Sequence, residues 1–208
     1  LFTDYATATL ALTVPPGWGV IASGSPLPTN PPVAESPENG PRRFAFAALQ
    51  PARYLSALIS RFEHHASPPR QVRLPDDVTR PSVPQADGAV FYDTLAVDAQ
   101  GNARSISELD TITSQTADIA AFYASLLDDI PYPSLTVALT DSRLPGGHSP
   151  AYFAVMNHEL PRPPGVYVSW KTDPVSFSNY PAFFLAHEVA HQWWGQAVGW
   201  KNYHEQWL

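Results

Sequence analysis

His187-Glu188-Val189-Ala190-His191 is the most informative stretch of this 208-residue sequence, and it runs on into Gln192-Trp193-Trp194-Gly195. Histidines four positions apart lie one helical turn apart, so their imidazoles leave the same face of a helix. In that arrangement they can bind one metal ion, and Glu188 can reach a water on the same ion. The spacing therefore predicts a metal site with His187 and His191 as ligands and Glu188 as the catalytic base.

The residues around this stretch predict that it lies on a buried helix. Pro181 suits the first turn of a helix, and Gly195 offers a stop. The apolar run 183–186 directly before His187 indicates a helix that is largely buried. Buried histidines at this spacing are poorly explained as part of a solvated surface, which favours a metal site over a chance match of the pattern.

The longer pattern resembles the gluzincin zinc metallopeptidases of the aminopeptidase N and leukotriene hydrolase family. In that family H-E-x-x-H-x-W is followed by a glycine, an aromatic-rich turn and Trp-Leu-x-Glu, whose Glu is the third zinc ligand. Here the chain passes Gly195 and Trp200 and stops at Trp207-Leu208, so the resemblance places this ligand at position 210, beyond the end of the sequence. The resemblance implies zinc as the cofactor, a peptide as the substrate, and a catalytic domain that is incomplete at its C-terminus.

Two other residues compete for the place of the third ligand. His204 and Glu205 follow the aromatic turn and can swing towards the two histidines in a chain that ends at Leu208. Because the family pattern places its ligand later, Glu205 is more simply interpreted as a carboxylate in the first turn of the next helix. His158 is expected to lie in a loop.

A second stretch, Pro145-Gly146-Gly147-His148-Ser149, bears on specificity. In the aminopeptidases of the resembling family, Gly-x-Met-Glu-Asn lies beside the zinc and its Glu binds the substrate's amino terminus. Ungapped counting from the preceding Tyr-Pro matches that Gly to Gly146 and that Glu to Ser149, so the acidic anchor is absent and aminopeptidase specificity is doubtful. We expect Gly146, Gly147, His148 and Ser149 to bind substrate, the glycines through their amides. His148 has the alternative of simply capping the loop.

Sequence patterns outside these stretches predict an α+β fold. Period-2 alternation predicts strands at 7–14, 18–22, 43–49, 89–97 and 134–140, helical offsets predict a long helix at 105–128, and residues 54–62 suit either type. With the resemblance, this gives an all-β segment at 1–62, a polar, Pro-rich connection at 63–88, and the N-terminal lobe of a thermolysin-like (gluzincin) catalytic domain at 89–208. His64 and His65 fall in the connection and are expected to be a solvated loop pair.

Composition narrows the choice of partners. The net charge of −7 argues against nucleic acid, and the absence of cysteine excludes disulfides and thiolate metal ligands. No apolar run reaches the length of a membrane span.

The chain starts with Leu1 rather than Met, so we expect an internal piece of a longer protein. Its missing C-terminal part would leave apolar surface exposed for self-association. The sequence does not determine the compartment; the location that we expect is extracytoplasmic or secreted.

The leading hypothesis is therefore zinc-dependent hydrolysis of peptide bonds, with Glu188 as general base on a zinc-bound water. The 208-residue chain itself is expected to show little or no hydrolysis, because two histidines alone bind zinc weakly. The alternative is a catalytically silent, peptidase-like domain that binds peptides or proteins. The absent acidic anchor favours that alternative, and the retention of both histidines and Glu188 opposes it.

Overall fold

The computed structural model describes residues 4–29, 40–66, 70–73, 85–86, 89–99, 106–140, 147–157 and 181–200. Its elements, in chain order, are β1 (Ala6–Val14), β2 (Gly19–Ala22), β3 (Ser25–Leu27), β4 (Arg42–Ala52), β5 (Ala57–Ser60), β6 (Phe62–Ala66), β7 (Arg70–Arg73), β8 (Gln85–Ala86), β9 (Ala89–Ala99), α1 (Ile106–Leu127), β10 (Ser134–Thr140), β11 (Phe153–Asn157) and α2 (Pro181–Ala190). Strands and helices occur together, as the predicted α+β class requires.

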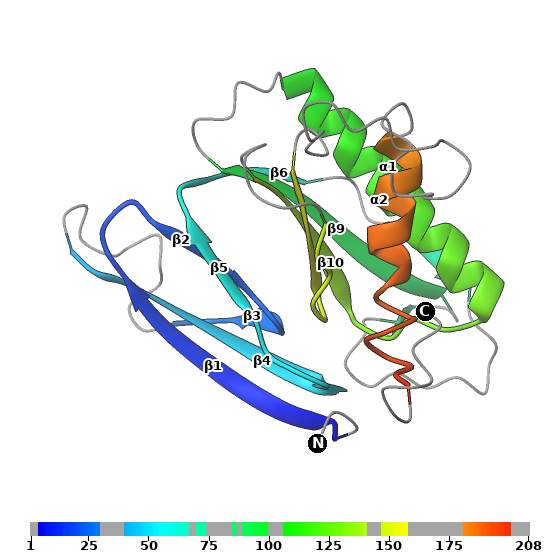
Figure 1. Cartoon of the computed structure of the whole chain (residues 1–208), viewed down its shortest axis with the longest axis horizontal. Coiled ribbons are helices and arrows are strands. Elements are labelled where there is room, and N and C mark those ends of the chain that lie inside the picture. Colours follow the sequence, from blue (N-terminus) through cyan, green and yellow to red (C-terminus); the bar gives the residue numbers. More distant parts are fainter. Residues whose placement is uncertain are drawn as a thin grey trace, which may run out of the picture.

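The N-terminal strands form two small antiparallel sheets, β1-β4-β3 and β2-β5 (Figure 1). Along β1 the exposure of the side chains alternates, and the strand ends on the buried Val14, which pairs with Arg42. The strands predicted at 7–14, 18–22 and 43–49 are thereby confirmed. The ambiguous stretch 54–62 forms the short strand β5, which pairs with β2.

The central sheet has the order β11-β10-β9-β6. β9, β10 and β11 run parallel, and β6 is antiparallel to β9. The strands predicted at 89–97 and 134–140 are confirmed as β9 and β10.

The stretch 63–88 is not the irregular connection that we expected. It contains most of β6 and all of β7 and β8, and each of these strands pairs with β9. His64 and His65 lie in β6, opposite Val97 and Ala96, rather than in a loop. The prolines of this stretch misled the prediction, because they lie between the strands and leave short segments free to pair. The division into segments 1–62, 63–88 and 89–208 stays a prediction.

Helices α1 and α2 lie against the same face of the central sheet (Figure 1). α1 spans 22 residues and confirms the helix predicted at 105–128. Its small residues Ala120 and Ala124 are almost fully buried, which lets the helix approach the sheet closely. α2 contributes larger apolar residues to the same core, among them Leu185 and Val189.

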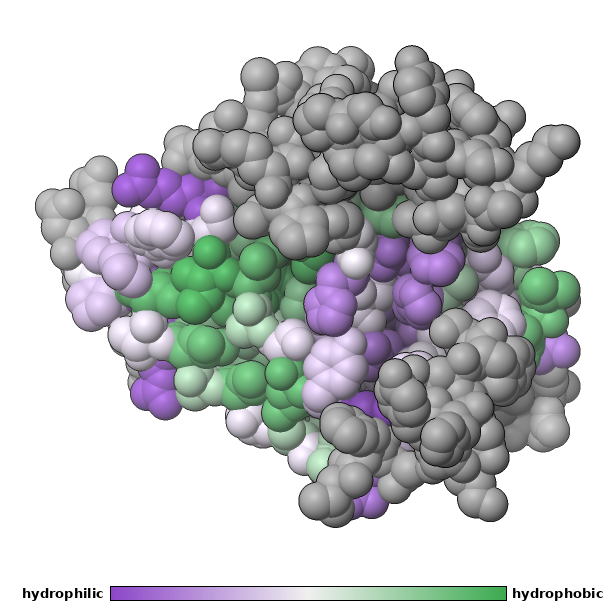
Figure 2. Space-filling model, viewed as in Figure 1, coloured by the Kyte–Doolittle hydropathy of each residue, from purple (hydrophilic) through white to green (hydrophobic). Residues whose placement is uncertain are grey.

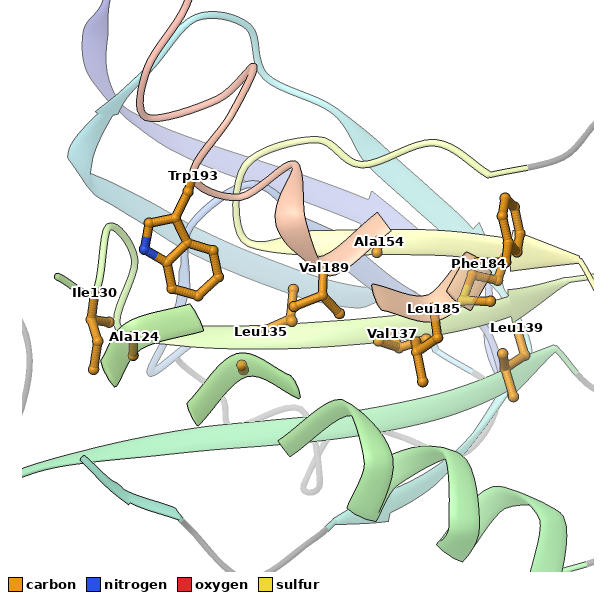
Figure 3. Packing of buried hydrophobic residues seen from close by; sticks show 12 residues of the cluster. Ala124, Ile130, Leu135, Val137, Leu139, Ala154, Phe184, Leu185, Val189 and Trp193 are labelled. Carbon is orange, nitrogen blue, oxygen red and sulfur yellow. The ribbon is translucent and has the colours of Figure 1, made fainter. Parts of the chain in front are cut away.

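Alternation along β10 separates the two faces of the sheet. Leu135, Val137 and Leu139 point to the helices and pack with α2, as Figure 3 shows. Ala138 points the other way and packs with Ile21 of β2. Because successive side chains of a strand leave opposite faces, one short strand serves both layers. Each fully buried Leu or Val contributes roughly 1.5–3 kcal/mol, so this core fixes α2 firmly on the sheet.

The surface of the N-terminal strands is partly apolar. Figure 2 shows apolar residues gathered over these strands, and Leu49 and Ile59 are among the exposed large side chains. Within the described part of the chain, no helix combines the length and apolar character needed to cross a membrane.

Candidate metal centre

The predicted metal ligands lie at the end of α2. The helix begins at Pro181, as predicted, and ends at Ala190, before the stop expected at Gly195. A hydrogen bond from the His191 amide to the His187 carbonyl, 3.3 Å long, continues the helical pattern by one residue. His187 is exposed and His191 is half-buried, so the expectation of buried histidines is wrong. The apolar side of α2 faces the core and leaves the imidazoles at the surface.

The two imidazoles converge. Their Nε2 atoms are 3.2 Å apart, and the rings are perpendicular, with an interplanar angle of 84°. Two nitrogens bound to one tetrahedral zinc at the usual bond length lie about 3.3 Å apart. The spacing of this pair therefore fits two of the ligands of a zinc ion.

A backbone carbonyl fixes the tautomer of His191. Its Nδ1 lies 3.0 Å from the carbonyl oxygen of Trp194. A carbonyl only accepts, so Nδ1 carries the proton and Nε2 keeps its lone pair. Zinc-binding histidines are commonly oriented by such a second hydrogen bond.

A third ligand does not lie among the residues that the structure describes, since no group of three metal-binding side chains occurs there. The competing candidates His204 and Glu205 fall outside the described residues, as does His158. The expectation of a ligand at position 210 stays a prediction.

Glu188 is buried beside this pair, with 4% of its surface exposed. Its Oε2 accepts a hydrogen bond of 2.6 Å from the Ser149 hydroxyl. On the other side of the carboxyl group the backbone passes so close that a Cβ added to Gly147 would overlap Glu188 and come within 2.7 Å of Phe184 Cζ. The glycine loop therefore lies directly against the predicted base.

The other members of the predicted substrate loop are placed differently. The His148 side chain is exposed and stacks on Tyr54, with ring centroids 6.2 Å apart. The backbone of His148 exchanges two hydrogen bonds with Val155 of β11, at 3.0 and 2.7 Å, so this part of the loop extends the edge of the sheet. Gly146 lies outside the described residues. A role of these residues in substrate binding stays a prediction.

Two glutamines that we did not single out join the loop to the metal-ligand region. Gln192 Oε1 accepts from the Tyr152 amide at 2.9 Å, and Gln192 Nε2 donates to the Pro150 carbonyl at 3.0 Å. Gln196 Nε2 donates to the Ser149 carbonyl at 2.8 Å. Both side chains are buried. Their spacing of four from Glu188 onward is a signal in the sequence that could have revealed them.

Tyr152 has an unusual backbone conformation next to this site. Its φ is 78°, in a region that non-glycine residues rarely adopt because it costs about 1–3 kcal/mol. The Tyr152 amide donates to Gln192, and the Tyr152 hydroxyl accepts a hydrogen bond of 3.1 Å from the Gln50 amide of β4. Burial raises the pKa of the Tyr152 hydroxyl. These contacts hold the strained residue in place and tie the N-terminal strands to the loop.

The N-terminal strands also contact the turn after α2. Arg53 Nη1 donates to the Gly195 carbonyl at 3.1 Å, and its guanidinium lies 4.3 Å from the ring centroid of Trp200. Gly195 has a φ of 101°, so only glycine adopts this turn without strain. The segment that follows the histidines is therefore held by a residue far away in the sequence.

No family model and no curated protein matches this sequence. The fold nevertheless matches solved structures of an M1 zinc metallopeptidase from Deinococcus radiodurans, with a TM-score of 0.62, 19% identity, and coverage of 95% of this chain and 36% of that one. A structure of a mutant of the Deinococcus radiodurans enzyme bound to a Tyr-Ser-Ala substrate matches with a TM-score of 0.58, 18% identity and the same coverage.

The described residues therefore share the fold of part of an M1 zinc metallopeptidase. At this identity the likeness is one of fold, and the chain spans about a third of the length of the structures that it matches. The resemblance to gluzincins is supported at this level. The narrower likeness to aminopeptidase N and leukotriene hydrolase stays a prediction.

Proposed function

We propose that this chain carries the catalytic motif of a zinc metallopeptidase that hydrolyses peptide bonds. The observation that carries the proposal is the pair of Nε2 atoms of His187 and His191, 3.2 Å apart at the end of α2, with Glu188 buried next to them. The fold of M1 zinc metallopeptidases supports it. On this proposal, residues 89–208 form the first lobe of a thermolysin-like domain whose third ligand follows Leu208.

Each residue of the motif has a task in this proposal. His187 and His191 would hold zinc through Nε2, and Trp194 would keep His191 in the binding tautomer. When bound, zinc acidifies water and polarises the peptide carbonyl. Glu188 would accept a proton from the attacking water and deliver it to the leaving amine. Its burial places the carboxylate where water is largely excluded, which strengthens its electrostatic interactions.

The specificity of the site is proposed to differ from that of an aminopeptidase. Ser149 stands where the resembling aminopeptidases have the Glu that binds the substrate's amino terminus. A neutral hydroxyl offers no charge to hold an ammonium group. We therefore expect peptides with a blocked amino terminus to be cleaved as well as those with a free one.

Metal content is the first test. The protein, extended beyond Leu208 to full length, should retain about one zinc per chain after dialysis, measured by mass spectrometry of the metal. His191→Ala should lose it, and His148→Ala, which changes an exposed histidine near the site, should keep it. Equal zinc content in His191→Ala and the parent would contradict the assignment of this pair.

Hydrolysis is the second test. Glu188→Gln should retain zinc and lower kcat by about 10²–10⁴-fold, because it removes a general base but no metal ligand. Zinc-loaded protein that cleaves none of a mixed set of free and blocked peptides would refute catalysis. Peptide binding without cleavage would then favour the silent, peptidase-like alternative.

A further inference from the structure

The carboxylate of Glu188 has a partner that the zinc motif does not provide. Ser149 lies 39 residues earlier in the sequence, and its Oγ donates to Glu188 Oε2 at 2.6 Å. Both residues are buried, with 5% and 4% of their surfaces exposed. A short hydrogen bond from a hydroxyl to a carboxylate is charge-assisted and stronger than a neutral one.

The hydrogen of the Ser149 hydroxyl is committed to this contact. A serine has one O–H, and here that hydrogen is given to Glu188, so it is not offered to a substrate. The main chain of Ser149 is fixed as well, because its carbonyl accepts from Gln196 Nε2 at 2.8 Å. Gln196 Nε2 also lies 2.9 Å from the Tyr54 hydroxyl, in the segment between β4 and β5.

The opposite side of the carboxyl group is closed by Gly147. A Cβ at this position would overlap the Glu188 carboxyl group, so the backbone lies against it without an intervening side chain. Glu188 is thus held between a donor on one side and a bare backbone on the other. This arrangement restricts rotation of the carboxylate about its last bond, which is otherwise a soft torsion.

We propose that Ser149 is a positioning residue that orients the carboxylate of Glu188, and that it does not contact the substrate through its side chain. The inference rests on the proposed peptidase function and replaces the expectation that the Ser149 side chain binds substrate. The chain Tyr54–Gln196–Ser149–Glu188 lets the N-terminal strands fix the geometry of the base. Orientation of a base matters because proton transfer requires hydrogen-bond distance to the attacking water.

The kinetic test compares Ser149→Ala, Ser149→Thr and the control Ser23→Ala in the zinc-loaded, full-length protein. Ser23 is a suitable control because it is fully buried and its Oγ accepts from the Ser56 amide at 3.1 Å, next to the ends of β2 and β5. Ser149→Ala should lower kcat by roughly tenfold or more while KM stays within about twofold. Ser149→Thr, which retains a hydroxyl, should recover most of the loss, and Ser23→Ala should leave kcat unchanged.

Three kinetic results would overturn the proposal. A rise in KM with unchanged kcat in Ser149→Ala would show a substrate contact instead. A kcat no lower than that of Ser23→Ala, or a Ser149→Thr protein as slow as Ser149→Ala, would remove the hydroxyl from the mechanism. Absence of hydrolysis in the parent protein itself would instead contradict the proposed function, so the two failures are distinguishable.

A double-mutant cycle on the unfolding of the zinc-free protein tests the contact without activity. Ser149→Ala should lower the unfolding free energy enough to change the equilibrium constant by about tenfold in the parent protein. In a Glu188→Ala background the same change should alter it by less than about threefold, because the partner is gone. Equal effects in both backgrounds would show that Ser149 does not act through Glu188.

Discussion

The two helices on the central sheet both bury polar side chains, but these side chains find their hydrogen-bond partners in different parts of the chain. In α1, Thr116 is 1% exposed, and its hydroxyl donates to the Ile112 carbonyl one turn away at 2.7 Å. In and after α2, Glu188, Gln192 and Gln196 are buried, and each forms a hydrogen bond with the loop 149–152, 39 to 47 residues away. Gln196 also donates to the Tyr54 hydroxyl, 142 residues away.

This difference distinguishes hydrogen bonds that only support a helix from hydrogen bonds that build the candidate site. A local bond within one helix forms whenever the helix forms, so it carries no information about the rest of the fold. Bonds to a distant loop fix two parts of the chain relative to each other, and a buried donor or acceptor left without its partner is costly. The polar groups around α2 therefore specify where the glycine loop lies with respect to Glu188, whereas Thr116 only accommodates burial.

Replacing Gln192 should have the largest effect on stability. Gln192→Met keeps the size of the side chain but leaves the buried Tyr152 amide without its acceptor. It also removes one of the two donors to the Pro150 carbonyl, which keeps only the Phe153 amide. We expect a loss of about 3 kcal/mol in the free energy of unfolding. Denaturant titration followed by tryptophan fluorescence measures it. A loss below about 1 kcal/mol would mean that the long-range bonds do not hold the loop, and the contrast between the helices would fail.

Gly147→Ala should have the next largest effect. The added methyl group would overlap the Glu188 carboxyl group, so either the loop or the carboxylate must move. We expect a loss of about 1–3 kcal/mol in the free energy of unfolding from overpacking. Hydrolysis should fall as well, with zinc content unchanged. The matched control is Gly17→Ala, since no atom lies within 4 Å of a Cβ at Gly17, although its φ of 75° still adds some strain.

The contrast between local and distant bonds also explains what the sequence could predict. Strand alternation and helical periodicity are local properties, and they placed β1, β9, β10 and α1 correctly. The pairing of His187 with His191 follows from helix geometry and was predicted for the same reason. The contact between Ser149 and Glu188 depends on how the loop folds back over 39 residues, which no local pattern encodes.

The proline-rich stretch shows a second limit of predicting structure from sequence. The stretch 63–88 is rich in proline, yet it contains strands that pair with β9. Pairing is decided by a partner strand outside the stretch, so composition alone underestimates it. The exposure of His187 was missed in a similar way, because the apolar run before it buries only one side of α2.

Thr116→Val should have a small effect. The substitution keeps the shape of the side chain and removes a hydroxyl that donates to the Ile112 carbonyl in its own helix. We expect a change of less than about 1 kcal/mol in the free energy of unfolding, measured by the same titration as for Gln192→Met. A loss as large as that of Gln192→Met would show that a hydrogen bond within one helix contributes as much to stability as the bonds to the distant loop.

The smallest effect at neutral pH is expected for Tyr132→Phe, which tests a third kind of buried polar group. Tyr132 is 1% exposed, its ring lies 4.6 Å from that of Tyr152, and no described residue forms a hydrogen bond with its hydroxyl. At pH 7 its removal should cost nothing measurable. Tyr152→Phe, by contrast, removes the acceptor of the Gln50 amide and should cost about 1 kcal/mol.

At alkaline pH the Tyr132 hydroxyl should affect the free energy of unfolding. Burial, reinforced by the neighbouring Tyr152, raises the pKa of Tyr132 well above its ordinary value of 10.0. Below about pH 9 the phenol is neutral in the folded and unfolded states alike, so it contributes no pH dependence. Above pH 10 the unfolded chain ionises while the folded protein keeps the proton, and stability is lost as the pH rises. Tyr132→Phe should therefore flatten the fall in unfolding free energy between pH 9 and pH 11. A fall as steep as that of the unmutated protein would mean that other tyrosines cause the alkaline sensitivity. Tyr5 and Tyr152 are candidates, because burial also raises their pKa values.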